Sequence, residues 1–320
     1  MTDDARWMGA ALALAERTRG RTAPNPNVGC VLVRDGRVVG RGWTQPGGRP
    51  HAEAMALEQA GGAARGATAY VTLEPCAHES PRGPSCADLL IGHGVGRVVA
   101  AMRDPDPRTD GAGLARLGDA GIACECGVGE GEAMRAMAGF LMRRAKGRPF
   151  VTLKLALSLD GGVAMADGRS QWITGPEARA HAHLERSRHE LILVGAGTLA
   201  ADAPRLDVRL AGLEARAPTR VVLGRRTDAP PGWTAIRAPG DIPDLPGDHL
   251  LVEGGAATAA AFLADDLVDR LLLYRAPILI GAARTLGDIG LADLSAAHGR
   301  WSLTQSRQLG VDTVEVYRRA

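Results

Sequence analysis

The chain has 320 residues, of which 45% are apolar, and its formal net charge at pH 7 is only +2. This length suggests two domains, while the low charge and the 3% of aromatic residues argue against partners such as nucleic acid or an anionic membrane. The odd number of five cysteines argues against a disulfide framework, and no window reaches the ~18 apolar residues of a membrane span, so we expect a cytoplasmic protein.

The first half of the chain alternates helices with strands, which predicts an α/β layered sheet. An amphipathic helix is expected over residues 2–18, and Asp35-Gly36 between two apolar runs predicts a hairpin of strands 28–33 and 37–42. Further helices are expected at 51–60, 86–93, 113–120 and 130–145, and further strands at 67–73, 97–102 and 122–126.

The basic segment 143–149 ends this pattern, so we expect one domain at 1–146 and a second at 147–320. The second domain is again α/β, with an irregular, Pro/Gly-rich surface stretch at 229–248. Its strands are expected at 150–157, 190–194, 220–223, 249–252, 267–274 and 312–317, and its helices at 176–189 and 254–263.

A zinc-ligand pattern stands out in the first half: His51, Cys76 and Cys86, with Glu53 two residues after the histidine. One imidazole and two thiols can hold zinc and leave the fourth tetrahedral position for water. Glu53 could then move protons to and from that water, and this residue pattern is typical of nucleobase deaminases. An alternative is a closed structural site in which His78 is the fourth ligand and Glu53 has no role.

The other cysteines, Cys30, Cys124 and Cys126, are interpreted as core or free thiols. Nine residues separate Cys76 from Cys86, and the prolines and glycine in that loop can fold it back so that both thiols reach one ion.

Two glycine turns in the second half indicate a dinucleotide site. Gly254-Gly255 follows a strand and opens a helix, and Gly195-Ala-Gly197-Thr198 repeats this arrangement. Free N–H groups at a helix N-terminus suit a pyrophosphate, although a plain tight turn gives the same sequence. Arg225 and Arg226 could bind a 2′-phosphate on such a dinucleotide, or they could be a solvated pair.

Three basic residues could contact the substrate of the second domain. Arg186 and Arg209 could clamp a phosphate, although Arg186 could equally lie on a solvated helix face. Lys154 is hypothesised to contact a sugar or cofactor from its strand, and the alternative is a lysine that extends from a strand edge into solvent.

The chain resembles the bifunctional deaminase–reductases of riboflavin biosynthesis over nearly its full length. The matching blocks are residues 22–30, 50–53, 70–78, 153–161, 170–175 and 252–255. The resemblance implies a cytidine-deaminase-like domain and a C-terminal domain like dihydrofolate reductase. It also implies zinc-dependent deamination of 2,5-diamino-6-ribosylamino-4(3H)-pyrimidinone 5′-phosphate, followed by NADPH-dependent reduction of the ribosyl chain to ribityl.

The same resemblance implies roles for individual residues: zinc ligation by His51, Cys76 and Cys86, proton transfer by Glu53, and substrate binding by Asn25 and Asn27. It implies NADP contacts at Ala156, Trp172, Thr198, Asp202, Gly255, Ala256, Ala257, Thr258, Ala259, Ala260 and Ala261. It implies contacts to the ribosylaminopyrimidine phosphate at Ser170, Arg186, Leu206, Arg209 and Glu253.

The sequence departs from the family pattern at a few positions. Trp43 stands where a histidine is common, Asp106 where asparagine is common, Ala112 where lysine is common and Arg225 where serine is common. The first three departures bear on phosphate recognition in the first site and keep open that only one half is active, whereas Arg225 lies near the cofactor site. The residues are also compatible with a zinc deaminase of another nucleotide or of a tRNA base, and with a non-catalytic zinc-stabilised binding protein. An α/β enzyme of this composition is also expected to form a homo-oligomer.

Overall fold

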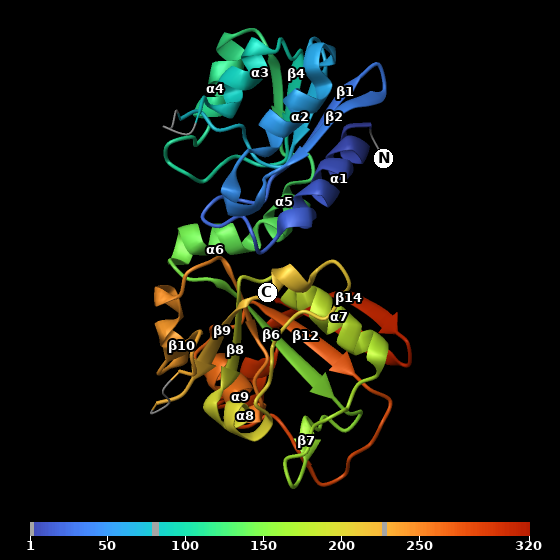
Figure 1. Ribbon diagram of the computed structural model, residues 1–320, viewed down its shortest axis with the longest axis vertical. Coiled ribbons are helices and arrows are strands. Elements are labelled where there is room, and N and C mark those ends of the chain that lie inside the picture. Colours follow the sequence, from blue (N-terminus) through green and yellow to red (C-terminus); the bar gives the residue numbers. More distant parts are fainter. Residues whose placement is uncertain (1–2, 79–82, 226–228) are drawn as a thin grey trace. The chain divides into compact units, whose positions relative to one another are not determined.

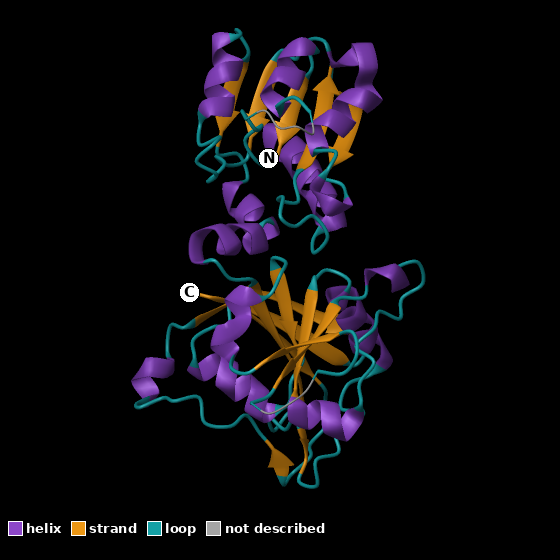
Figure 2. Cartoon of the chain, turned by 60° about the vertical axis from the view of Figure 1, so that its left-hand side comes forward, coloured by secondary structure: helices purple, strands orange, loops and turns teal. Residues whose placement is uncertain are grey.

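The structure is a computed structural model that describes residues 3–78, 83–225 and 229–320 (Figure 1). The chain divides into two compact units, Met1–Gly147 and Arg148–Ala320. Each unit has its own apolar core and its own β-sheet with helices lying against it (Figure 2). None of the described helices is long and apolar enough to cross a membrane.

The first unit is built on a five-stranded sheet in the order β2-β1-β3-β4-β5. The hairpin β1–β2 and the pair β1–β3 are antiparallel, whereas β3, β4 and β5 run parallel. The strands are β1 (Gly29–Arg34), β2 (Arg37–Trp43), β3 (Thr68–Val71), β4 (Arg97–Ala100) and β5 (Ala123–Cys126). The hairpin turn uses Asp35 and Gly36, both at positive φ, as the Asp-Gly signal predicted.

Helices pack closely on both faces of the hairpin because glycines face them. A Cβ on Gly29 would lie 1.9 Å from the Ala11 carbonyl oxygen in the first helix. A Cβ on Gly42, whose neighbour on β1 is Cys30, would lie 2.0 Å from the Ala52 oxygen in the second. Consecutive residues of a strand face opposite sides, so these two helices cover opposite faces of the sheet. The close contact at Gly42 fixes the position of the second helix, and with it His51 and Glu53 at the start of that helix.

The helices of the first unit follow the predicted order: α1 (Asp3–Ala15), α2 (Ala52–Ala60), α3 (Cys86–Gly92), α4 (Ala112–Asp119), α5 (Glu130–Ala136) and α6 (Ala138–Lys146). The single helix expected over 130–145 is instead two helices. The break is at Met137, whose φ of −102° and ψ of 19° are not helical.

The second unit contains an eight-stranded sheet in the order β10-β9-β8-β11-β6-β12-β15-β14. All neighbours are parallel except β12–β15 and β15–β14. The strands are β6 (Phe150–Leu157), β8 (Leu191–Gly195), β9 (Thr219–Leu223), β10 (Trp233–Ile236), β11 (His249–Val252), β12 (Arg270–Arg275), β14 (Trp301–Leu309) and β15 (Asp312–Arg319). A small sheet pairs β7 (Ala164–Met165) with β13 (Ala283–Arg284).

Three helices accompany this sheet: α7 (Pro176–Arg186), α8 (Ala196–Asp202) and α9 (Ala256–Ala264). One expectation was wrong here, and one further strand of the sheet was missed. The stretch 229–248, expected to be irregular, contains strand β10. Strand β14 was not predicted, because seven of its nine side chains are exposed and its sequence has no apolar alternation.

Candidate active sites

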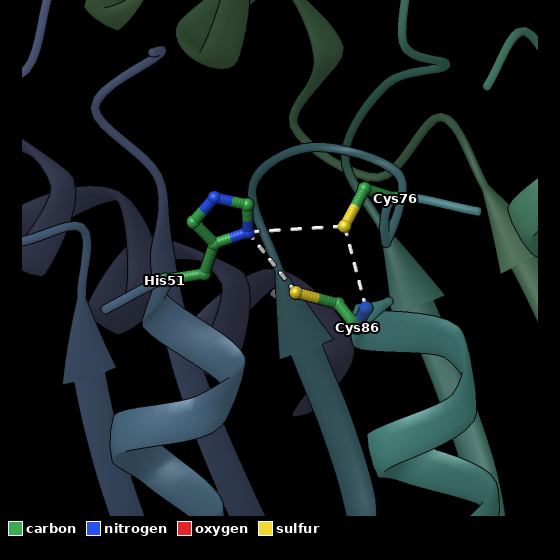
Figure 3. A group of neighbouring side chains, drawn as sticks. All are labelled: His51, Cys76 and Cys86. Atoms are coloured by element: carbon green, nitrogen blue, oxygen red, sulfur yellow. Dashed lines mark hydrogen bonds between the residues drawn. The ribbon is translucent and has the colours of Figure 1, made fainter. Parts of the chain in front are cut away.

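Three metal-ligating side chains meet in the first unit (Figure 3). His51 occupies the position just before α2, Cys76 lies in the loop after β3, and Cys86 begins α3. His51 Nδ1 is 3.3 Å from Cys86 Sγ and 3.8 Å from Cys76 Sγ, and the three donor atoms all lie within 4.8 Å of one another. Motifs 35 residues apart therefore converge on one point.

This donor set fits zinc. With Zn–S bonds of ~2.3 Å and Zn–N bonds of ~2.0 Å, tetrahedral ligands lie roughly 3.5–3.8 Å apart, close to the observed spacings. The hydrogen bond from Cys86 lowers the pKa of the Cys76 thiol, assisted by the neighbouring His51, so the thiolate needed for ligation is favoured. His78 lies outside the group, with its Nδ1 3.5 Å from Thr109 Oγ1. The described residues therefore offer three ligands and not the closed set of four.

Glu53 lies in the first turn of α2 and is buried. Burial raises the pKa of its carboxyl to about 7, against an opposing effect of His51 and with a further contribution from Cys76. A carboxyl group with a pKa near neutrality can both accept and donate a proton. The position and the pKa suit the proton-transfer role that the sequence indicated.

A cavity of about 140 Å³ opens beside these groups. His51, Glu53 and Cys76 line it together with Asn25, whose Nδ2 lies 3.1 Å from His51 Nε2 and donates to the Gly48 oxygen at 2.9 Å. Asn27 has a different position: its buried amide donates to the Ala15 and Ala136 oxygens, which ties α1 to α5. The structure thus brings Asn25 to the cavity, whereas the Asn27 side chain holds α1 and α5 together.

Several residues of the cavity wall were not singled out as site residues from the sequence. Asp104, Asp106 and Arg108 follow β4, and Phe140 and Arg144 lie on α6. The Asp-Pro-Asp-Pro-Arg run could have been recognised, because ligand sites in α/β proteins lie beyond the carboxyl ends of parallel strands. No local signal marks the α6 residues.

The remaining cysteines are free thiols. Cys30 is buried in the first core, whereas Cys124 and Cys126 are exposed on β5.

A second charged cluster lies in the second unit. Arg186, the last residue of α7, donates to Glu253 from Nε at 2.7 Å and from Nη2 at 2.9 Å. Lys154 Nζ on β6 is 3.9 Å from Glu253 Oε2 and 5.8 Å from the ring centre of Tyr274. Burial opposes ionisation of Glu253, but Arg186 and then Lys154 outweigh it and lower its pKa to about 2.

The two glycine turns of the second unit pack against each other through Thr258. A Cβ on Gly195 would lie 2.2 Å from Thr258 Oγ1, and one on Gly254 would lie 2.4 Å from Thr258 Cβ. A Cβ on Gly255 would lie 3.6 Å from Thr198 Oγ1. The N-termini of α8 and α9 are therefore neighbours, an arrangement in which both turns could contact one ligand.

The other residues singled out in the second unit have varied surroundings. Trp172 is 64% exposed with the Arg179 guanidinium 4.9 Å from its ring, whereas Leu206 and Ala259 are buried. Arg209 Nε donates to His183 Nε2 at 3.3 Å, and His183 Nδ1 donates to the Asp207 oxygen at 3.1 Å. Ala156, Ser170, Ala256 and Ala261 are half-buried, Ala260 is buried, and Asp202, Arg225, Gly255 and Ala257 are exposed, while Arg226 lies outside the described residues.

Asp160 stabilises a turn. Its carboxylate accepts hydrogen bonds from Ser158 Oγ and from the backbone N–H groups of Ile280 and Gly281. These bonds lower the pKa of Asp160 to about 2.

Two family models match the chain. The model described as "Cytidine and deoxycytidylate deaminase zinc-binding region" matches residues 1–102, and the model "RibD C-terminal domain" matches 149–238 and 243–314. These matches confirm the expected fold class, a cytidine-deaminase-like N-terminal domain and a C-terminal domain like dihydrofolate reductase.

Whole proteins resemble the chain over nearly its full length. The riboflavin biosynthesis protein RibD of Escherichia coli K12 is 40% identical, with 97% of each chain covered, and that of Mycobacterium tuberculosis H37Rv is 40% identical, covering 95% of this chain and 94% of its own. The solved structure of Acinetobacter baumannii RibD is 36% identical, with a TM-score of 0.88 and 99% of each chain covered. A deaminase/reductase of Thermotoga maritima is 32% identical, with a TM-score of 0.90 and the same coverage.

Proposed function

Because the chain belongs to the RibD family, the bifunctional deaminase–reductases of riboflavin biosynthesis, we propose which of its residues carry out the two steps. The first unit would deaminate 2,5-diamino-6-ribosylamino-4(3H)-pyrimidinone 5′-phosphate. The second would reduce the ribosyl chain with NADPH, giving 5-amino-6-ribitylamino-uracil 5′-phosphate.

In the first step, His51, Cys76 and Cys86 hold zinc, which supplies an activated water when bound. Glu53 accepts a proton on its carboxylate and returns it to the departing amino group. Its buried position beside the ligand group supports that role. Asn25 keeps the His51 ring in place from the Nε2 side and faces the substrate.

In the second step, Lys154 and Glu253 face the sugar, and Arg186 fixes the Glu253 carboxylate. NADPH supplies a hydride when bound, and the ammonium group of Lys154 can donate a proton at the reacting sugar. The cofactor contacts are Ala156, Trp172, Thr198, Asp202, Arg225 and the start of α9, from Gly255 to Ala261. The further substrate contacts are Ser170, Leu206 and Arg209.

The observation that carries the deaminase assignment is the convergence of three ligand atoms on one point, beside a cavity that a buried carboxylic acid lines. The test is incubation of zinc-loaded protein with the diaminopyrimidinone ribotide, with and without NADPH. Ammonia should appear in both reactions, and NADPH absorbance should fall only after deamination. Ammonia release from cytidine or tRNA but not from the ribotide, or full activity after exhaustive chelation, would contradict the proposal.

We also propose a cytoplasmic location and self-association. The five free thiols suit a reducing compartment. The edge strand β14 has an unpaired backbone edge and exposed side chains, a surface that second copies often cover. Sedimentation equilibrium at micromolar concentration should give at least a dimer, and a monomer would contradict this part.

A further inference from the structure

One wall of the first-unit cavity carries an ion-pair cluster that the steps above do not use. Asp106, in the loop after β4, is 5% exposed and accepts hydrogen bonds from the backbone N–H of Arg108 at 3.0 Å and from Arg108 Nε at 3.0 Å. Arg108 Nη2 and Arg144 Nη2 both donate to its other oxygen at 2.5 Å. All three residues line the cavity, so one carboxylate holds two guanidinium groups there.

The cluster retains unused hydrogen-bond donors and a net positive charge. Against the described residues, Arg108 uses Nε and Nη2 and Arg144 uses Nη2, which leaves N–H groups at Nη1 of Arg108 and at Nε and Nη1 of Arg144. Their side chains are 60% and 42% exposed, in contrast to the buried carboxylate. Hydrogen bonding from Arg108 and the nearby charge of Arg144 hold the pKa of Asp106 well below its usual range.

We propose that Arg108 and Arg144, oriented by Asp106, bind the 5′-phosphate of the substrate during deamination. This inference rests on the proposed function, which supplies a phosphorylated substrate. A guanidinium group presents planar pairs of N–H donors that match phosphate oxygens. Asp106 is a positioning residue: it touches the arginines and not the phosphate.

The departures from the family pattern agree with this assignment. Position 106 carries an acid, which alone would repel a phosphate, and position 112 lacks a cation. Two arginines outweigh the single charge of the aspartate that holds them. Of the positions Trp43, Asp106 and Ala112, only Asp106 lies among the described residues that line the cavity.

An ordinary surface ion pair is the competing explanation. Exposed ion pairs contribute little to stability and need no ligand. Arg103 provides a matched control: it lies in the same loop, donates to the Asp110 oxygen at 2.6 Å, is 62% exposed and is not among the cavity-lining residues.

The test compares kcat/KM for ammonia release from the ribotide and from its dephosphorylated form, with full-length zinc-loaded protein. Arg108→Gln and Arg144→Gln should each lower the ratio of the two values by about 10- to 100-fold, the effect of one lost charge-assisted hydrogen bond. Arg103→Gln should keep the wild-type ratio. Asp106→Asn should raise KM for the ribotide more than it lowers kcat, and ribose 5-phosphate should inhibit the two arginine variants more weakly than wild type.

An unchanged ratio in both arginine variants, or the same fall in Arg103→Gln, overturns the phosphate site. A fall in kcat alone for Asp106→Asn overturns its positioning role. Because the ratio is internal to each protein, partial misfolding does not mimic the expected result. Failure of the wild-type protein to release ammonia would instead overturn the proposed function.

Discussion

Arg186 and Glu253 form a two-point ion pair inside the second unit, with Nε–Oε1 and Nη2–Oε2 distances of 2.7 and 2.9 Å. The Glu253 side chain is only 7% exposed and the Arg186 side chain 14%. Arg186 also donates from Nη1 to the Asp207 oxygen at 3.0 Å. Arg186 therefore uses most of its N–H groups for contacts within the protein. Its main role in the structure is to orient the Glu253 carboxylate.

Replacing Arg186 by methionine should leave Glu253 buried beside Lys154 alone. Breaking a buried ion pair typically costs about 3–5 kcal/mol, so the second unit should unfold at lower urea concentration. NADPH oxidation should fall by at least about 10-fold, since the carboxylate loses its fixed orientation. The two readouts are urea denaturation and NADPH absorbance, and ammonia release serves as the internal control.

Acid stability tests the same pair. The folded pKa of Glu253, about 2, lies below its ordinary value of 4.5. The stabilisation is therefore present above pH ~4.5 and is lost as the pH falls towards 2. Between pH 4.5 and 2, the free energy of unfolding should fall less steeply with falling pH in Arg186→Met than in wild type, and Arg186→Lys should lie between the two. Equal slopes in wild type and Arg186→Met would contradict the argument.

Glu53→Gln should remove the proton-transfer group but keep the shape of the cavity. We expect ammonia release to fall by about 10²- to 10⁴-fold, the usual contribution of a general acid–base. Zinc content measured by atomic absorption should not change, because Glu53 is not in the ligand group. NADPH oxidation with the deaminated intermediate should also persist, and a variant that retains deaminase activity would contradict the role of Glu53.

Glu74 should be required for the shape of the cavity wall. Its carboxylate accepts four backbone N–H bonds, from Asp104 at 3.1 Å, Gly111 at 2.9 Å, Gly113 at 2.9 Å and Leu114 at 3.1 Å. A glutamine would turn an NH₂ group towards some of these donors, and each unpaired buried N–H costs about 1–3 kcal/mol. Glu74→Gln should therefore loosen the loop that carries Asp104 and Asp106.

Hydrogen exchange of residues 103–115 should become faster in that variant, with a rise in KM for deamination. Glu132→Gln is the matched control, because Glu132 is exposed and, within the described part of the chain, forms an ion pair with Arg135 one turn away on α5. Unchanged exchange in Glu74→Gln would show that the loop does not depend on this carboxylate.

The zinc group could be recognised from the sequence because its chemistry needs particular residue types. His51 and Glu53 share one short motif, and both cysteines lie next to predicted element ends. The Asp106–Arg144 pair could not be predicted, because it joins residues 38 positions apart that carry no local signal. Arg186 and Glu253 were singled out separately as substrate contacts, and only the fold shows that they bind each other.

Strand β14 illustrates a second limit of sequence reasoning. Periodicity reveals a strand only when one face is buried, and the middle of β14 is exposed on both faces. Its existence depends on its pairing with β15, which the local sequence does not encode. In contrast, β6 was predicted with its observed bounds because its side chains are largely buried.

Glu190 should make the second unit less stable as the pH rises. Burial, and then the charge of Asp248, raise the pKa of Glu190 from 4.5 to about 7, although its Oε2 accepts the His249 N–H at 2.9 Å. Because its pKa is higher in the folded protein than in the unfolded chain, protonated Glu190 contributes to stability. This contribution is fully present below pH ~4.5 and is lost as the pH rises through 7.

The largest loss this shift allows is roughly 3 kcal/mol. Glu190→Gln keeps an acceptor for His249 and cannot ionise, so the difference between its melting temperature and that of wild type should grow from pH 5 to pH 8, in favour of the variant. Glu214→Gln, which changes an exposed carboxylate, should follow wild type at every pH. Parallel curves for wild type and Glu190→Gln would mean that the Glu190 carboxylate is no harder to ionise in the folded protein than in the unfolded chain.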